Sequence, residues 1–170
     1  MRLRNVRGTI SISVVGLGLA LSVGGCSKDS PTQPPAPPAG EYATISSFMG
    51  TGIAGLGTLG SAPGQFLLYL PQDLTFGPDG LPYVLDWNNH RVVRVRSGAV
   101  EAVIGTAQLG DAPEGPPLTV NLNHPTHISF DLQGRLVLSA WHNSKIMRLD
   151  FTSNWLSLIC GDGTRRSERA

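Results

Sequence analysis

The chain has 170 residues, a length that predicts about one domain. Only 15% of its residues are charged, against roughly 25% in an average soluble domain. With 21 glycines, 13 prolines and few strong helix-forming runs, the composition excludes a coiled coil, a helical bundle and an acidic disordered chain. The formal net charge of +1 offers no basic field to a phosphate backbone, so we do not expect nucleic acid as a partner.

The first 25 residues have the parts of an export signal. Three arginines within the first seven positions precede an uncharged stretch over 8–25, which ends in small residues before a cysteine. A transmembrane helix is the alternative, but the stretch lies at the short limit for spanning a bilayer, and several Gly and Ser residues weaken it. Without the three arginines, ten basic and twelve acidic side chains remain, so the processed chain is slightly acidic.

The residues Val23-Gly24-Gly25-Cys26 resemble a bacterial lipobox, in which the bond before the cysteine is cut and the thiol is lipidated. The resemblance implies a signal peptide over 1–25 and a membrane anchor at Cys26, where several acyl chains such as palmitate add their transfer free energies. It places the protein in the bacterial cell envelope, and Ser27 in place of an Asp favours the outer membrane if the source is Gram-negative. An ordinary signal peptide that contains a cysteine is the alternative.

Residues 26–40 are expected to carry the lipidated cysteine and a tether. Five prolines between positions 31 and 38 lack amide donors and favour an extended path with little apolar surface to bury. A proline-rich docking ligand is the alternative, although the position directly after the lipid site favours a spacer.

An internal repeat dominates the rest of the chain, because residues 70–98 match residues 124–152 at an offset of 54. The matched positions are Pro71 with Pro125, Phe76 with Phe130, Gly80 with Gly134, Trp87 with Trp141, Asn89 with Asn143, and Arg94 with Arg148. Alternating apolar residues and turn signals predict strands over 73–76, 82–86, 91–96 and 100–104, and again over 126–130, 135–140, 145–150 and 156–160. Residues 43–49 are expected to form one extra strand. Four-stranded units that repeat at about 40–55 residues are typical of propeller blades.

The repeats resemble those of the NHL-repeat family of β-propellers. The resemblance rests on the Pro-x-x-Leu/Ile-x-Phe openings, the Asp-Gly turn, the run Asp86-Trp-Asn-Asn-His-Arg91 and the Gly-rich stretch over 50–57, and it covers about 43–163. It implies an all-β domain over 41–163, an incomplete NHL-type β-propeller with about two four-stranded blades plus the extra strand.

The same resemblance implies a repeat turn built from Asp86, Asn89 and Arg91 in the first blade and from Asn143 in the second. The second repeat departs from the pattern, with Ala140 for the Asp and Lys145 for the Arg, so we expect an ion pair within the first blade only. The Asn of each turn is expected to hold left-handed backbone.

Two blades are fewer than the roughly four to eight of a closed propeller, and open sheet edges favour aggregation. Residues 164–170 depart from the repeat pattern, which leads us to expect a truncated product. Self-assembly of several short chains into one ring is the alternative.

Residues 50–55 fit the pattern GxGxxG, but the residues that follow cannot form the helix that a dinucleotide site requires. We therefore interpret these glycines as a loop between blades. No Ser/His/Asp constellation or nucleophile elbow is present. After processing, Cys160 is the only remaining cysteine apart from Cys26, and its apolar surroundings predict a buried, unreactive strand thiol.

The candidate site residues are expected on one rim of the propeller, because the loops between the second and third strands lie on the same face as the loops between blades. The side chains expected there are Trp87, Asn88, His90, His124, Trp141 and His142. The paired tryptophans could stack on a sugar or an extended peptide, whereas packing of both between blades is the alternative. His124 and His127 are weak metal candidates by comparison with propeller lyases, and we expect no cofactor.

We therefore expect a lipid-anchored, exported protein that binds a protein, peptide or glycan through its loop face without catalysis. A metal-dependent propeller lyase or lactonase is one alternative. A truncated fragment of a longer NHL protein, without function by itself, is the other.

Overall fold

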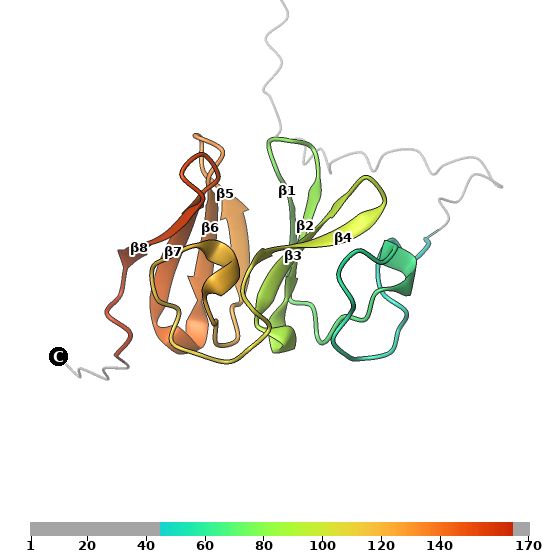
Figure 1. Cartoon of the computed structure of the whole chain (residues 1–170), viewed down its shortest axis with the longest axis horizontal. Helices are drawn as coiled ribbons and strands as arrows, with labels where there is room; N and C mark the ends of the chain where they lie inside the picture. The colour runs from blue at the N-terminus through green and yellow to red at the C-terminus, as the bar shows by residue number, and fades with distance from the viewer. Residues whose placement is uncertain (1–44, 165–170) are drawn as a thin grey trace, which may run out of the picture. The chain divides into compact units, whose positions relative to one another are not determined.

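The computed structural model of the chain describes residues 45–164 (Figure 1). The predicted signal peptide, the tether with Cys26 and residues 165–170 of the tail lie outside the described residues. Between residues 45 and 164, no helix is long and apolar enough to cross a membrane.

The described chain folds into two four-stranded antiparallel sheets, in which strands that follow one another in sequence are neighbours (Figure 1). The first sheet contains β1 (Asp73–Phe76), β2 (Pro82–Asp86), β3 (Arg91–Arg96) and β4 (Ala99–Ile104). The second sheet contains β5 (His127–Phe130), β6 (Leu136–Ala140), β7 (Lys145–Asp150) and β8 (Trp155–Cys160). The predicted all-β fold with two propeller blades is confirmed, and the strands lie within one residue of their predicted bounds.

Short 3-10 turns occupy matching places in the two blades. η1 (Pro63–Gln65) and η3 (Pro117–Thr119) precede the first strand of each sheet, while η2 (Trp87–Asn89) and η4 (Trp141–Asn143) join the second and third strands. The residues that follow η2 and η4, His90 and Ser144, are left-handed, with φ of 53° and 52°. The prediction that Asn89 and Asn143 hold the left-handed backbone is therefore wrong by one residue, because each asparagine ends the turn and buries its side chain.

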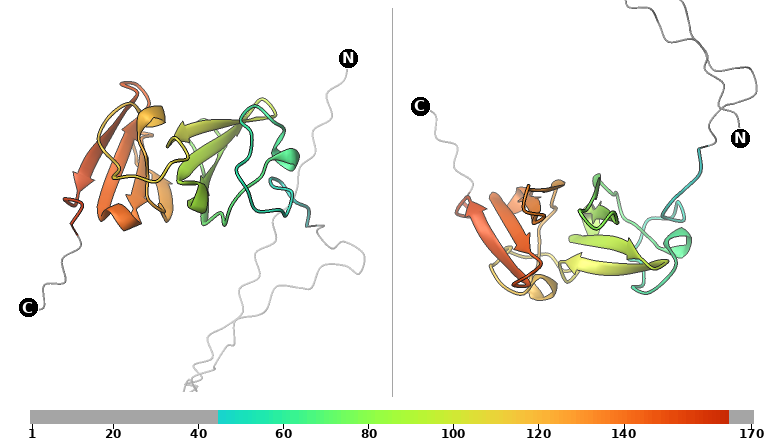
Figure 2. Two further views of the ribbon diagram at one scale, coloured as in Figure 1. Left: turned by 60° about the horizontal axis from the view of Figure 1, so that its bottom comes forward. Right: turned by 90° about the horizontal axis from the view of Figure 1, so that it is seen from above.

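The main core lies between the two sheets, which Figure 2 shows side by side. Its largest fully buried members are Tyr83, Leu85, Val92 and Ile104 from the first sheet, Leu122 from the connecting segment, and Ile128, Leu136, Leu138, Met147, Leu149 and Leu156 from the second. Each such side chain contributes about 1.5–3 kcal/mol on burial, so the contact between blades is a major source of stability. A smaller core of Phe66, Val84, Val93 and Val100 covers the other face of the first sheet.

The outermost strand of each blade is covered by the loop that precedes that blade. Val100 in β4 exchanges backbone hydrogen bonds with Gly60 and Ser61, at 2.8 and 3.0 Å. Leu156 in β8 exchanges two with Gly115, at 2.8 and 3.0 Å. Backbone groups of Val100 and Leu156 that would otherwise be open to a foreign strand are thereby used, which interrupts the free edge of both strands.

Two predictions about the ends of the repeat region need correction. The extra strand expected over 43–49 is not formed by residues 45–49, which are irregular, and residues 43 and 44 lie outside the described part. Cys160 is exposed rather than buried, because no described segment covers the far face of β8. Residues 50–55 form a loop, as predicted.

Candidate functional site

The turn between β2 and β3 is held by a buried polar network. Asp86 Oδ2 accepts a hydrogen bond from Asn89 Nδ2 at 2.8 Å and pairs with Arg91 Nε at 2.9 Å. The side chains of Arg91 and Asp86 are only 5% and 0% exposed. Asp86 Oδ1 also accepts the backbone amide of Tyr69, and Asn89 Nδ2 donates to the carbonyl of Gly55, each at 2.8 Å. The network thus fastens the turn to the loop segments that precede the blade.

The second blade fastens the same turn with a single asparagine. Asn143 Oδ1 accepts the backbone amide of Asn123 at 3.0 Å, and Asn143 Nδ2 donates to the carbonyl of Gly110 at 2.7 Å. Ala140 stands in the place of the aspartate, so Lys145 donates instead to two backbone carbonyls of the same loop, at 2.8 and 3.0 Å. The ion pair of the first blade thus has no counterpart at this turn.

These two turns and the segment between the blades bring together the loop-face cluster. Its members are Trp87, Asn88, His90, His124, Trp141 and His142. The separations of its ring centroids are 4.5 Å for Trp87–His124, 4.4 Å for His90–His124, 4.8 Å for His124–His142 and 4.1 Å for Trp141–His142. An unbroken series of rings therefore runs from one tryptophan to the other. Trp87 is half-buried, whereas Trp141 is 54% exposed, so packing between blades does not account for Trp141.

His124 lies at the centre of the cluster and is held from three sides. Its backbone amide donates to His90 Nδ1 at 3.2 Å. Its ring Nδ1 lies 2.7 Å from Asn123 Oδ1, and its Nε2 lies 3.2 Å from Asn88 Oδ1. Because His90 Nδ1 accepts a hydrogen bond, neutral His90 carries its proton on Nε2.

The surroundings of His90 and His124 favour the uncharged form of both imidazoles. Burial lowers the pKa of His90 below its ordinary value of 6.5, and His124 and His142 lower it further, against the opposing charge of Asp86. Burial likewise lowers the pKa of His124, with His142 acting in the same direction. Both rings are therefore mainly neutral at pH 7, so these two positions present aromatic faces and neutral polar groups.

His127 lies apart from this cluster. It begins β5 with an exposed side chain, and its Nδ1 is 2.6 Å from Asp73 Oδ2. The two histidines considered as weak metal candidates, His124 and His127, thus have different partners. Within residues 45–164, no three His, Cys, Asp or Glu side chains are arranged to hold a metal ion.

Two contributing residues, Asn123 and Asp73, were not singled out from the sequence. Asn123 orients the ring of His124. Asp73 joins the blades, because its Oδ2 accepts the backbone amide of Ile128 at 2.8 Å as well as facing His127. The sequence feature that could have pointed to Asp73 is that the first repeat has an acidic residue, Asp73, where the second repeat has a basic one, His127.

Comparison with known proteins adds little to this geometry. No family model matches the chain, and no curated protein matches it. Among solved structures, it is similar to a protein of unknown function from Bacteroides thetaiotaomicron, with 20% identity over 52% of this chain and a TM-score of 0.49. It is also similar to virginiamycin B lyase from Staphylococcus aureus, with 19% identity over 52% of this chain and a TM-score of 0.39. The matches cover 23% and 26% of those two chains, so this chain spans only a part of each.

Proposed function

We propose that the loop-face cluster is a non-catalytic binding surface for a neutral carbohydrate. The observation that carries the proposal is the continuous series of rings from Trp87 through His124 and His142 to the exposed Trp141. An exposed indole stacks on the apolar face of a sugar ring, and its neighbours can hydrogen-bond the hydroxyls.

The polar groups around the rings support an uncharged ligand. Asn88 offers an amide, and His90 offers its Nε2–H because Nδ1 is occupied. The carboxylate of Asp86, next to Trp87 in the sequence, is buried and paired with Arg91. Hydroxyl groups would find both donors and acceptors among these residues, and the ammonium group of Lys145 beside Trp141 already donates to two backbone carbonyls.

An array of neutral oligosaccharides printed beside an array of extended decapeptides tests this function. We expect the full chain to bind members of the oligosaccharide set and the Trp141→Ala variant to lose that binding. Trp155→Ala is the matched control, because Trp155 is also exposed but begins β8 at the opposite end of the second blade. Binding of decapeptides alone, or equal binding by both variants, would contradict the proposal.

We further propose that this surface is displayed at the bacterial cell envelope by an NHL-type propeller, with 1–25 as signal peptide, 26–40 as lipid anchor and tether, and 41–163 as the propeller blades. Support comes from the lipobox-like run before Cys26 and from the repeat motifs. Labelling of expressing bacteria with a palmitate analogue provides the test. We expect incorporation into the chain and its loss in Cys26→Ser, and labelling that persists in the variant would contradict the anchor.

A further inference from the structure

Each blade leaves one face uncovered in the described part of the chain. Leu74 in β1 is 47% exposed, whereas Ile128, at the same position of β5, is 1% exposed because it faces the first blade. On the other side, Val103 in β4 is 6% exposed, and Ile159, at the same position of β8, is 46% exposed. Among residues 45–164, one copy of each side of the interface between blades is therefore left without a partner surface.

The uncovered side of the second blade contains a shallow cavity of about 290 Å3 that is wide open on one side. It is lined by Trp141, Lys145, Ile146, Cys160, Gly161 and three small neighbours. In the first blade the same place is filled by the segment that ends at His124. There, the amide of Gly105 donates to the carbonyl of Pro117 at 2.9 Å, Leu122 is fully buried and the ring of His124 lies against Trp87. Trp141 and Gly161, which line the cavity, are the repeat equivalents of Trp87 and Gly105, which contact this segment in the first blade.

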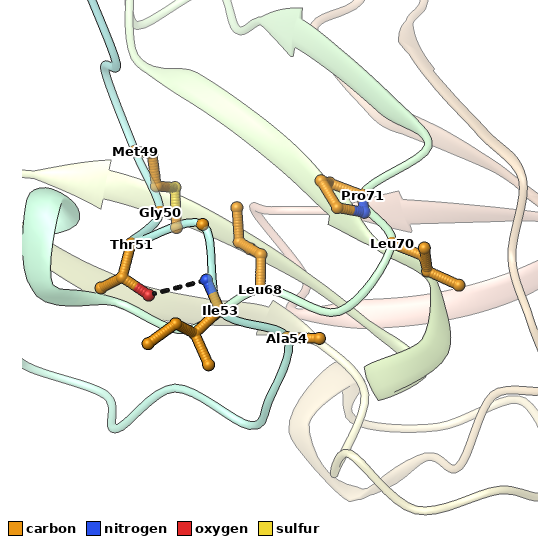
Figure 3. A pocket seen from close by; sticks show the side chains of 9 residues that line it. Met49, Gly50, Thr51, Ile53, Ala54, Leu68, Leu70 and Pro71 are labelled. Atoms are coloured by element: carbon orange, nitrogen blue, oxygen red, sulfur yellow. Dashed lines mark hydrogen bonds between the residues drawn. The ribbon is translucent and has the colours of Figure 1, made fainter.

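The uncovered side of the first blade presents such a segment. Leu68 and Leu70 occupy the repeat positions of Leu122 and His124. Leu70 and His124 share a left-handed backbone, with φ of 52° and 47°, and the parallel bridge Ala54–Leu68 repeats the bridge Leu109–Leu122. Figure 3 shows Leu68 and Leu70 at a groove of about 310 Å3 that is lined almost entirely by apolar side chains and glycines.

The polar groups that begin the inner strands of the two blades can also pair between copies. Asp73 lies 2.6 Å from His127 inside the chain, and His127 occupies the repeat position of Asp73 on the second blade. If the first blade of another copy followed the second blade, Asp73 of that copy would meet His127 with the two positions exchanged, the imidazole on the preceding blade and the carboxylate on the following one. The contact would therefore bring the same two polar groups together, in exchanged places, beside the repeated apolar packing.

We propose that the chain associates head to tail with further copies of itself, the segment with Leu68 and Leu70 entering the cavity beside Trp141 of the next copy. The contact is heterologous, so repetition closes a ring if the rotation allows. With two blades from each copy, the roughly four to eight blades of a closed propeller correspond to about two to four copies. Trp141 would then be covered to the same extent as Trp87, which stays on the loop face.

One short segment must move for this contact to form. The amide of Gly50 donates to the carbonyl of Pro63 at 3.0 Å, in the place where Gly105 meets Pro117 in the interface between blades. Residues 45–50 of one copy and the end of β8 of its neighbour therefore compete for one position. β8 is paired along its length with β7, whereas residues 45–49 form no strand and expose Ile45 and Phe48. We expect residues 45–50 to yield, so deletion of this segment should strengthen the association.

Sedimentation velocity of the purified full-length chain in detergent, over a range of concentrations, tests the proposal. We expect the protein mass to rise to about two to four times that of one chain. Ile159→Arg alters the uncovered face of the second blade, and Leu70→Asp alters that of the first blade. Each variant alone should stay monomeric. Far-UV circular dichroism establishes that both are folded. Leu132→Asp, a fully exposed residue in the β5–β6 turn and outside both faces, is the matched control and should associate like the wild type.

A mixture of the two face variants distinguishes a head-to-tail contact from a symmetric one. Each variant retains the face that the other has lost, so the mixture should form dimers and nothing larger. A wild-type chain that is monomeric at every concentration, folded variants that still associate alone, or a deletion of residues 45–50 that weakens association would overturn the proposal.

Discussion

The two blades fasten the same turn to the same loop with different side chains. In the first blade, the carboxylate of Asp86 accepts a backbone hydrogen bond, and the side chain of Asn89 donates one to a backbone carbonyl. The guanidinium of Arg91 balances the charge of the carboxylate. In the second blade Asn143 both accepts and donates, and Lys145 caps nearby carbonyls. Both solutions satisfy the same backbone groups, so the turn depends on a complete set of hydrogen bonds rather than on one residue pattern.

The difference matters for the site, because the two turns present the tryptophans of the loop-face cluster. His90 accepts a hydrogen bond from the backbone amide of His124, in the segment between the blades. The equivalent residue of the second blade, Ser144, has no such neighbouring segment in the described residues. The first turn is thus built into the interface between blades, and the second leaves Trp141 accessible.

Removal of the carboxylate in the first blade has the largest expected effect. Asp86→Ala leaves the guanidinium of Arg91 buried without a counter-charge, which should lower the free energy of unfolding by about 3–5 kcal/mol. Urea denaturation measures this loss. The double variant Asp86→Ala/Arg91→Met removes both charges and should recover most of the stability, and no recovery would contradict a role for the ion pair.

Removal of the asparagine in the second blade should cost less, because no charge is left unpaired. Asn143→Ala deprives the amide of Asn123 and the carbonyl of Gly110 of their partners, with an expected loss of about 1–3 kcal/mol. Thr152→Ala, in the exposed turn before β8, serves as control and should change stability by less than about 0.5 kcal/mol. A loss in Asn143→Ala as small as in this control would show that the two blades are not equivalent.

The pH dependence of stability sharpens the contrast between His90 and Ser144. The pKa values of His90 and His124 are lowered in the folded chain, so the unfolded chain takes up protons first as the pH falls through about 6.5. The free energy of unfolding should therefore decrease from pH 8 toward pH 5. Denaturation of His90→Ser, which copies the second blade, should show a shallower decrease. If the free energy of unfolding of the variant fell with pH as steeply as that of the wild type, His90 would not contribute to the pH dependence.

Truncation of Trp141 should have the smallest effect on stability. More than half of this side chain is exposed, so we expect Trp141→Ala to change the free energy of unfolding by less than about 1 kcal/mol. Its effect on affinity for a bound oligosaccharide should be larger, about tenfold or more, as for an aromatic anchor of an interface. Thermal melting and titration of the same preparation separate the two effects.

The strands and the position of the rim follow from the sequence, because alternation, turn residues and a repeat of 54 residues specify them locally. The side-chain roles do not follow in the same way. Asn89 and Asn143 were assigned to left-handed backbone, but their function is to bond loops 34 and 33 residues away. Cys160 was expected to be buried because its neighbours are apolar, yet exposure depends on what covers β8. Contacts between distant segments decide both points, and a local pattern does not contain them.

The most direct test of the loop-face cluster is the response of the indole N–H signals of Trp87, Trp141 and Trp155 to an oligosaccharide from the array. Two-dimensional NMR of the full chain, with each signal assigned by a Trp→Phe variant, provides the measurement. The account predicts that the signals of Trp141 and Trp87 shift together on titration while that of Trp155 stays in place. A shift confined to Trp155, or no shift of Trp141 at saturation, would contradict it.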